Sequence, residues 1–379
     1  MKALLHILVY SFLFIGCTTT VQKIEVVDIK PKKQSISIVK PTVDTKKVDV
    51  VEKTDTIPED VAEEEVTVKE DNKLVIIFPS VTIGKYALEA TNTINTYLLY
   101  KNKQIKLTVL DMVVQNENNL LEVFNIVQEK QIKNVVAMIT KDNLDILNSI
   151  EGIKDIKIYL PLINKSEIEN IDQLSELNIV FGAINYQEQF NKLIEYSDSL
   201  SLAELYDNTA IGNTLHNYLK SYDLKYTKKV DDNNGNYKNF LKNKKLNNAV
   251  VILNTPIVKS SILLSAITAG DLNISKIVST QLNYTPLIFS LTQKQDRKKL
   301  IIANSIGKIP DDLLEYNQLI GNNILYSWVN YSSIIGVEYL LNGNIDLFDD
   351  LKIEENQIIY PVNLYKVGDN SFELINTTK

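Results

Sequence analysis

Residues that commonly perform catalysis or hold metals are scarce in this 379-residue chain, which has one cysteine, two histidines and twelve glycines. A single cysteine excludes an intramolecular disulfide, so the fold must be held by its apolar core. His216 is the only histidine outside the first sixteen residues. One histidine cannot form a His-rich metal site, and it leaves no spare base for a Ser-His pair. We interpret His216 as a surface or half-buried residue of a helix.

Glycine motifs that hold nucleotides are also missing. No two glycines are spaced two apart, no Gly-x-Ser-x-Gly elbow occurs, and no phosphate loop ends in Gly-Lys-Ser/Thr. Adjacent acids occur at Asp311-Asp312, Asp349-Asp350 and Glu354-Glu355, and we interpret them as solvated rather than as a glycosidase pair. The formal net charge of -7 provides no broad basic surface for nucleic acid. We therefore expect a binding protein without a cofactor or metal, and not an enzyme.

The N-terminus has the pattern of an export signal. Lys2 precedes an apolar run from Ala3 to Ile15, and Gly16-Cys17 follows. The run is shorter than the roughly 20 apolar residues that a membrane-spanning helix needs. An uncleaved anchor or a buried N-terminal helix is the alternative interpretation. Phe14-Ile15-Gly16-Cys17 resembles a bacterial lipobox, which implies that residues 1–16 are removed and that Cys17 carries acyl chains such as palmitate.

The segment from Thr18 to Asn72 differs in composition from the rest of the chain. It has no aromatic residue and no glycine, it has three prolines, and its charges are scattered throughout. Such a segment buries too little apolar surface to offset its ordering entropy, so residues 17–72 are predicted to be a lipidated, disordered tether. A stray strand formed by its Val and Ile residues is the alternative. Thr18 is not the Asp that retains some lipoproteins at the inner membrane, which favours the outer membrane.

From Lys73 onward, short apolar runs alternate with amphipathic stretches, as in parallel sheets crossed over by helices. Strands are predicted at Leu74–Phe78, Ile105–Leu110, Asn134–Ile139, Ile156–Leu160, Asn178–Gly182, Leu202–Tyr206, Leu224–Val230, Ala249–Leu253, Ile274–Ser279, Leu300–Ala303 and Gln357–Val367. Helices are predicted at Gly84–Tyr100, Leu120–Glu129, Asp142–Ile150, Thr209–Tyr222 and Asp311–Leu341, and after Thr255-Pro256, where Asn254 or Thr255 is the expected cap.

This pattern predicts an α/β chain with two doubly wound, mostly parallel sheets, each forming one lobe. We expect residues 73–184, with about 300–345, to form lobe 1. Residues 185–299, with about 346–379, are expected to form lobe 2.

Ligands in open α/β sheets bind beyond the carboxyl ends of strands, where helix N-termini present free backbone amides. This rule selects the positions that follow the predicted strands. The candidates are Pro79, Ser80, Val81 and Thr82; Thr140; Asp207, Asn208 and Thr209; and Gln281 and Tyr284. Ordinary capping and turn formation are the alternative roles for each of them.

Three stretches together resemble a known family. They are Ile77-Phe78-Pro79-Ser80 with Ile83-Gly84-Lys85-Tyr86-Ala87, then Leu205-Tyr206-Asp207-Asn208-Thr209-Ala210-Ile211-Gly212, and then Ser279-Thr280-Gln281 near Tyr284. In this order they resemble type I periplasmic binding proteins, and especially the C-terminal domain of penicillin-binding protein activator lipoproteins. The resemblance covers most of the chain from Lys73 to Lys379. The enteric activators carry a helical-repeat domain ahead of this fold, where this chain has the predicted tether.

The resemblance implies a non-enzymatic periplasmic lipoprotein that contacts a peptidoglycan synthase, such as a class A penicillin-binding protein, and that is anchored to the membrane by its N-terminal lipid. It carries over no catalytic residue. A solute-binding lipoprotein of an ABC importer, with an amino acid or another small polar ligand in its cleft, shares the fold and is the alternative function. The predicted cleft residues include one acid, Asp207, and no arginine, which favours the first function.

Overall fold

The computed structural model describes residues 72–142, 144–198, 201–230 and 237–376. The predicted signal peptide, the lipidated Cys17 and nearly all of the predicted tether lie outside these described residues. The tertiary structure therefore bears on the part of the chain that was predicted to be bilobed.

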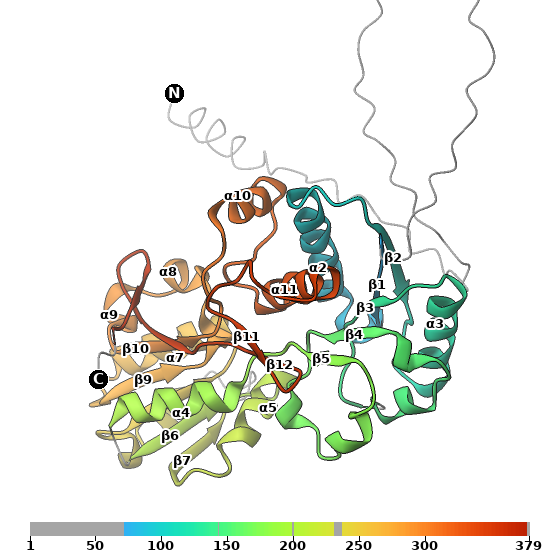
Figure 1. The fold of residues 1–379 in the computed structure, drawn as a ribbon. Helices are drawn as coiled ribbons and strands as arrows, with labels where there is room; N and C mark the ends of the chain where they lie inside the picture. Colours follow the sequence, from blue (N-terminus) through green and yellow to red (C-terminus); the bar gives the residue numbers. More distant parts are fainter. Residues whose placement is uncertain (1–71, 143, 199–200, 231–236, 377–379) are drawn as a thin grey trace, which may run out of the picture. The chain divides into compact units, whose positions relative to one another are not determined.

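The described residues form two seven-stranded sheets, in agreement with the predicted α/β fold (Figure 1). The first sheet has the order β11-β12-β5-β4-β3-β1-β2 and the second has the order β14-β13-β10-β9-β8-β6-β7. The first sheet contains β1 (Lys73–Phe78), β2 (Lys106–Asp111), β3 (Asn134–Ala137), β4 (Lys157–Leu160), β5 (Ile179–Phe181), β11 (Lys352–Glu354) and β12 (Gln357–Ile359). The second contains β6 (Leu202–Tyr206), β7 (Leu224–Lys229), β8 (Val250–Asn254), β9 (Lys276–Ser279), β10 (Leu300–Asn304), β13 (Asn363–Val367) and β14 (Phe372–Leu374).

The central strands are uninterrupted apolar runs because both faces of each sheet are covered. In β1, Leu74 and Ile76 join one apolar cluster, while Val75 and Ile77 join another on the opposite face. Neighbouring strands from β2 to β5 and from β6 to β10 pair in parallel, and antiparallel pairs occur where β11, β13 and β14 are added at the sheet edges.

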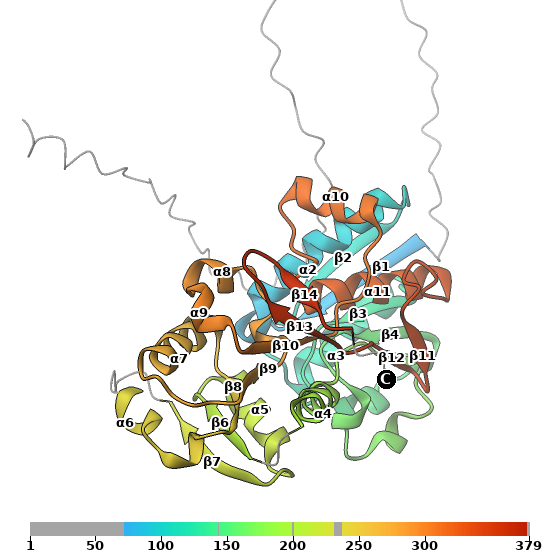
Figure 2. The ribbon, with the colours of Figure 1, turned by 90° about the vertical axis from the view of Figure 1, so that its left-hand side faces the viewer.

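Helices cover both faces of each sheet. On the first sheet, α2 (Ser80–Tyr100) and α11 (Trp328–Asn342) pack on one face and α3 (Glu117–Glu129) on the other, and α10 (Asp311–Ile320) packs on α2. On the second sheet, α4 (Tyr186–Ser197) and α5 (Ala210–Leu219) cover one face, and α7 (Ile257–Ala269) covers the other. The short helices α6 (Tyr237–Leu241), α8 (Leu287–Leu291) and α9 (Lys294–Arg297) contact α7 (Figure 2).

The chain passes between the sheets three times, after β5, after β10 and after β12. Three strands next to these crossings, β10, β11 and β12, belong to a different lobe from the one expected. β10 pairs with β9, so Leu300–Asn304 belongs to lobe 2 rather than lobe 1. β12 pairs with β5, so Lys352–Glu354 and Gln357–Ile359 belong to lobe 1 rather than lobe 2. Strand partners are chosen by contacts distant in sequence, which the local apolar pattern does not encode.

Several predicted elements differ in kind or extent from the observed ones. The region predicted as a helix at Asp142–Ile150 contains a 3-10 turn at Leu144–Ser149, and the Asp311–Leu341 helix is two helices interrupted after Gly321, whose φ of 80° ends α10. Gln357–Val367 is two strands in different sheets, because Pro361 separates β12 from β13. Helix α7 begins at Ile257 without a side-chain cap.

Helix α4 was not predicted, although its N-terminus carries a recognisable signal. The Asn185 side chain accepts a hydrogen bond from the Glu188 backbone N–H and so caps the helix.

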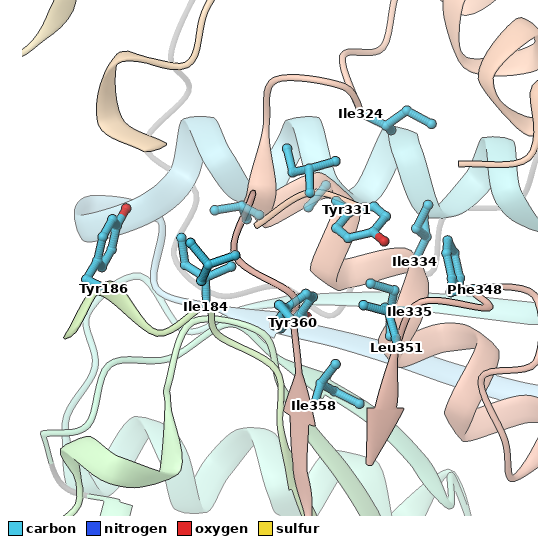
Figure 3. Close-up of a cluster of buried hydrophobic side chains, with 14 of the residues drawn as sticks. Ile184, Tyr186, Ile324, Tyr331, Ile334, Ile335, Phe348, Leu351, Ile358 and Tyr360 are labelled. Carbon is cyan, nitrogen blue, oxygen red and sulfur yellow. The ribbon is translucent and has the colours of Figure 1, made fainter. Parts of the chain in front are cut away.

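One apolar cluster contains side chains from both sheets, including Ile76 of β1 and Ile252 of β8. Figure 3 shows part of it, where side chains from α11, from the segment after it and from β12 gather around Tyr331. The Tyr331 ring packs edge-on against Phe348, with 5.6 Å between ring centroids. The core is therefore continuous from one lobe to the other through the segments that connect them.

Candidate functional site

The two lobes line a half-open cavity of about 550 Å³, which is within the range of small-molecule sites. Lobe 1 contributes α2, the loop after β4 and the start of α11, and lobe 2 contributes α5 and the 3-10 turn Gln281–Asn283. The lining residues are Ile83, Tyr86, Glu89, Leu162, Glu167, Ala183, Ile184, Tyr186, Ile211, Thr214, Gln281, Leu282, Tyr326, Ser327, Trp328 and Val329. Most of these side chains are aliphatic or aromatic.

Hydrogen bonds and ring contacts join the lobes around this cavity. The Tyr218 hydroxyl of α5 donates to Glu167 Oε1 of lobe 1 at 2.5 Å. Trp328 at the start of α11 and Tyr186 at the start of α4 both line the cavity. Burial raises the pKa of the Glu167 carboxyl, because a charged carboxylate is poorly solvated there, and the Tyr218 hydrogen bond opposes this effect.

Gln281 is the one predicted site residue that lines the cavity. Its backbone N–H donates to Gln189 Oε1 at 2.8 Å, and its own Oε1 accepts from Gln189 Nε2 and from the Ser305 backbone N–H. Its Nε2 is buried and has no hydrogen-bond partner. Gln281 thus has a fixed side chain whose buried amide nitrogen has no hydrogen-bond partner.

The lobe 2 loop after β6 does not face the cavity as expected. Asp207 is fully buried and pairs with Lys259 Nζ at 2.9 Å, so its charge is already balanced within lobe 2. Thr209 Oγ1 donates to Asp207 Oδ1 and accepts from the Gly212 backbone N–H, which caps α5. Asn208 is exposed and is not among the lining residues.

The lobe 1 candidates serve turns and helix ends. The Ser80 backbone N–H donates to Asp111 Oδ1 at 3.0 Å at the start of α2, preceded by the buried Pro79. Val81 and Thr82 are exposed and do not line the cavity, which is contacted one turn later by Ile83 and Tyr86.

Thr140 also has a local role. Its backbone N–H donates to Gln115 Oε1 at 2.8 Å, and Gln115 Nε2 donates to the Thr140 carbonyl at 3.0 Å. This pair of bonds holds together the loops after β2 and β3. Neither residue is among those that line the cavity.

Tyr284 lies beside the cavity in an aromatic cluster. Its ring centroid is 5.5 Å from that of Tyr326, which lines the cavity, and 4.3 Å from that of Phe372 in β14. Tyr284 therefore supports a lining residue and joins lobe 2 to the segment that precedes α11.

His216 is half-buried, as interpreted from the sequence, but its partner was not foreseen. Its Nδ1 lies 2.7 Å from Glu204 Oε2, and its ring stacks on Tyr206 with centroids 4.1 Å apart. Glu204 is fully buried in β6 and also accepts from Asn254 Nδ2. The sequence did contain a signal for this pair, because Glu204 is a charged residue within the otherwise apolar run of β6.

Sequence reasoning missed most of the cavity because its lining side chains come from helix faces and connecting segments rather than from strand ends. Tyr86 and Glu89 lie within α2, Tyr186 begins α4, and Trp328 begins α11. Among the described residues, no cluster of three or more His, Cys, Asp or Glu residues is arranged to hold a metal ion. In the same part of the chain, no helix is long and apolar enough to cross a membrane.

The sequence matches no protein-family profile and no curated protein. Solved structures with a similar fold do exist. LpoA from Haemophilus influenzae superimposes with a TM-score of 0.55 and 10% identity, over 83% of this chain and 60% of that one. The branched-chain amino-acid transporter protein LivJ from Streptococcus pneumoniae, solved with isoleucine, superimposes with a TM-score of 0.54 and 11% identity, over 80% of this chain and 99% of that one. A branched-chain amino-acid ABC transporter protein from Thermus thermophilus with bound valine superimposes with a TM-score of 0.54 and 13% identity, over 80% of this chain and 94% of that one.

The chain therefore has the bilobed fold of type I periplasmic binding proteins, as the sequence resemblance implied. LpoA shares this fold, and this chain spans about three fifths of its length. At identities near one in ten these matches establish the fold.

Proposed function

We propose that this chain is a non-enzymatic lipoprotein of the bacterial cell envelope that binds and activates a class A penicillin-binding protein by protein–protein contact. The shared fold of the penicillin-binding protein activator LpoA supports the proposal. The observation that carries it is an exposed apolar surface on lobe 1, which we name the α10 patch. It consists of Tyr316, Leu319 and Ile320 of α10.

The α10 patch is formed by side chains spaced along one face of a helix. Tyr316 lies one turn before Leu319 and Ile320, and Leu319 is 79% exposed. The Tyr316 ring contacts Tyr100 of α2, with centroids 5.9 Å apart, and the two helices lie side by side in both ribbon views (Figure 1, Figure 2). A cluster of exposed large apolar side chains is typical of a protein-binding surface.

The test is stimulation of a purified class A penicillin-binding protein from the same organism. The wild-type chain should bind the synthase and raise its glycan-polymerising rate, and the double exchange Leu319→Ser/Ile320→Ser should reduce both effects at least about tenfold. The control is Val258→Ser/Ile262→Ser, a matched exposed pair on α7 of lobe 2, which should leave both unchanged. Absence of binding by the wild-type chain would refute the proposal.

We further propose that residues 1–16 are removed, that Cys17 carries the lipid and that the outer membrane holds it. The lipobox-like sequence ahead of Cys17 supports this. Mass spectrometry of the purified N-terminus should show a diacylated or triacylated Cys17, and Cys17→Ser should release the protein from the membrane fraction. An intact Met1 or an unmodified Cys17 would contradict the lipoprotein assignment.

A solute-binding subunit of an importer is the second candidate, favoured by the cavity between the lobes. The transporter proteins with bound isoleucine and valine share the fold. A ligand present at about a hundredfold excess over its dissociation constant should stabilise the protein by about 2.7 kcal/mol. A thermal-shift screen of amino acids checks this candidate, and a marked shift without any synthase binding would favour it over the first.

A further inference from the structure

The chemistry of the cavity identifies a class of ligand. Its lining contains two carboxylates, Glu89 and Glu167, and no lysine, arginine or histidine. An anionic ligand would meet two negative groups without a countercharge from the lining. A cationic group would instead gain two attractive partners, the exposed Glu89 and the half-buried Glu167, and its interaction with Glu167 would be stronger than in water.

Aromatic side chains reinforce this preference. Tyr86, Tyr186, Tyr326 and Trp328 contribute rings to the same cavity. The electron-rich faces of tryptophan and tyrosine attract organic cations, and aromatic lining is a recurrent means of recognising alkylated ammonium groups. The remaining lining is mostly aliphatic and suits the alkyl substituents of such a cation.

A polar contact is available at the lobe 2 wall. Gln281 lines the cavity and is 5% exposed, and its Nε2 is buried without a hydrogen-bond partner. A buried donor without an acceptor costs free energy, which a ligand oxygen would recover.

We propose that the cavity between the lobes binds an organic cation, an alkylated ammonium compound that also carries a hydrogen-bond acceptor. The two carboxylates hold the charge, the rings of Tyr186 and Trp328 pack against the alkyl groups, and Gln281 donates to the acceptor. The inference depends on the cavity alone and holds whether the chain serves a synthase or an importer.

Trp328 provides the measurement, because it is the only tryptophan of the chain and it lines the cavity. Choline is the probe, and 3,3-dimethylbutan-1-ol is its uncharged isostere with carbon in place of nitrogen. Titration of the full chain with choline should change the Trp328 fluorescence saturably, and the isostere should bind at least on the order of tenfold more weakly. Equal binding of the two, or no response to millimolar choline, would overturn the proposal.

Two exchanges locate the binding. Glu89→Gln, at an exposed position of α2, should weaken choline binding about tenfold, whereas Glu122→Gln, an equal charge change on α3 outside the cavity, should leave it unchanged. Tighter binding of leucine than of choline would show that the ligand is a zwitterion, and would refute the assigned class. Synthase activation is measured separately, so a failure here leaves the proposed function standing, and the reverse also holds.

Discussion

Tyr159 illustrates how single residues set the packing at the centre of lobe 1. Its side chain is fully buried, and its hydroxyl is 2.9 Å from Ser332 Oγ of α11. Two glycines leave room for it. A Cβ built on Gly336 would lie 2.1 Å from the Tyr159 ring, and one built on Gly182 would lie 2.1 Å from the hydroxyl. Close approach of α11 to β4 therefore depends on the absence of these two side chains.

Gly336→Ala should destabilise the protein by about 1–3 kcal/mol, because the added methyl group overlaps a buried ring that has no space to move. This cost outweighs the roughly 1 kcal/mol by which alanine favours a helix over glycine. Gly84→Ala in α2 is the control. Its Cβ would meet nothing closer than 3.4 Å, so the free energy of unfolding should stay unchanged or rise. Urea denaturation checks both, and a Gly336→Ala variant as stable as wild type would contradict the packing argument.

The half-buried carboxyl of Glu167 should make the free energy of unfolding depend on pH. Burial raises its pKa above the ordinary value of 4.5, so the folded protein holds this proton more tightly than the unfolded chain does. The resulting stabilisation is complete below about pH 4.5 and is lost as the pH rises through the raised pKa.

Glu167→Gln should remove that dependence, since glutamine is neutral at every pH and its oxygen can still accept from Tyr218. The unfolding free energy of the variant, relative to that of wild type, should increase as the pH rises from about 4 to about 8. Chemical denaturation across this range measures the difference, with Glu122→Gln as a control for loss of a surface carboxylate. A difference of opposite sign would contradict the burial argument.

At the scale of elements, α10 has two faces with different roles. Leu313 and Asn317 are fully buried, and α10 packs on α2, while Leu319 and Ile320 point to solvent. The buried face attaches the helix to lobe 1. On the exposed face, Tyr316 also contacts Tyr100 of α2, whereas Leu319 and Ile320 are available for a partner.

Leu313→Ala should lower the unfolding free energy by about 2–5 kcal/mol, since it opens a cavity under the helix. Leu319→Ala, the same chemical change on the same helix, should alter it by no more than about 0.5 kcal/mol. Thermal unfolding compares the two variants. Equal destabilisation by both would mean that the α10 patch is part of the core, and it would then be unsuited to partner binding.

At the scale of the whole molecule, one apolar cluster runs through both lobes, and the chain passes between them three times. Neither lobe is assembled from one continuous stretch, because β11 and β12 return to lobe 1 after β10 of lobe 2, and β13 and β14 then return to lobe 2. Loss of either lobe would therefore expose apolar surface of the other.

Both lobes should unfold in a single transition. Fluorescence of Trp328 reports the contact between the lobes, and far-ultraviolet circular dichroism reports both sheets. Their midpoints in denaturant should coincide. A second transition in the dichroism after the fluorescence change is complete would show that the lobes unfold separately.

Local patterns were sufficient to predict the fold class. Apolar runs such as Leu74–Phe78 and Ala249–Leu253 are typical of strands buried on both faces, and the amphipathic stretches between them are typical of covering helices. The order of these elements then indicated two parallel sheets. The scarcity of histidine and clustered glycine was likewise a property of the sequence itself, and it directed the functional argument towards binding.

Tertiary structure decided where the late strands pair and which residues meet at the cavity. Asp207 lies at a strand end, as predicted, yet its carboxylate forms an ion pair with Lys259, which is 52 residues away in the sequence. Glu167 of lobe 1 and Gln281 of lobe 2 come from distant segments and line the same cavity only because the two lobes pack against each other. Such contacts depend on the docking of whole elements, a property of three-dimensional packing that the local periodicity of apolar and polar residues does not specify.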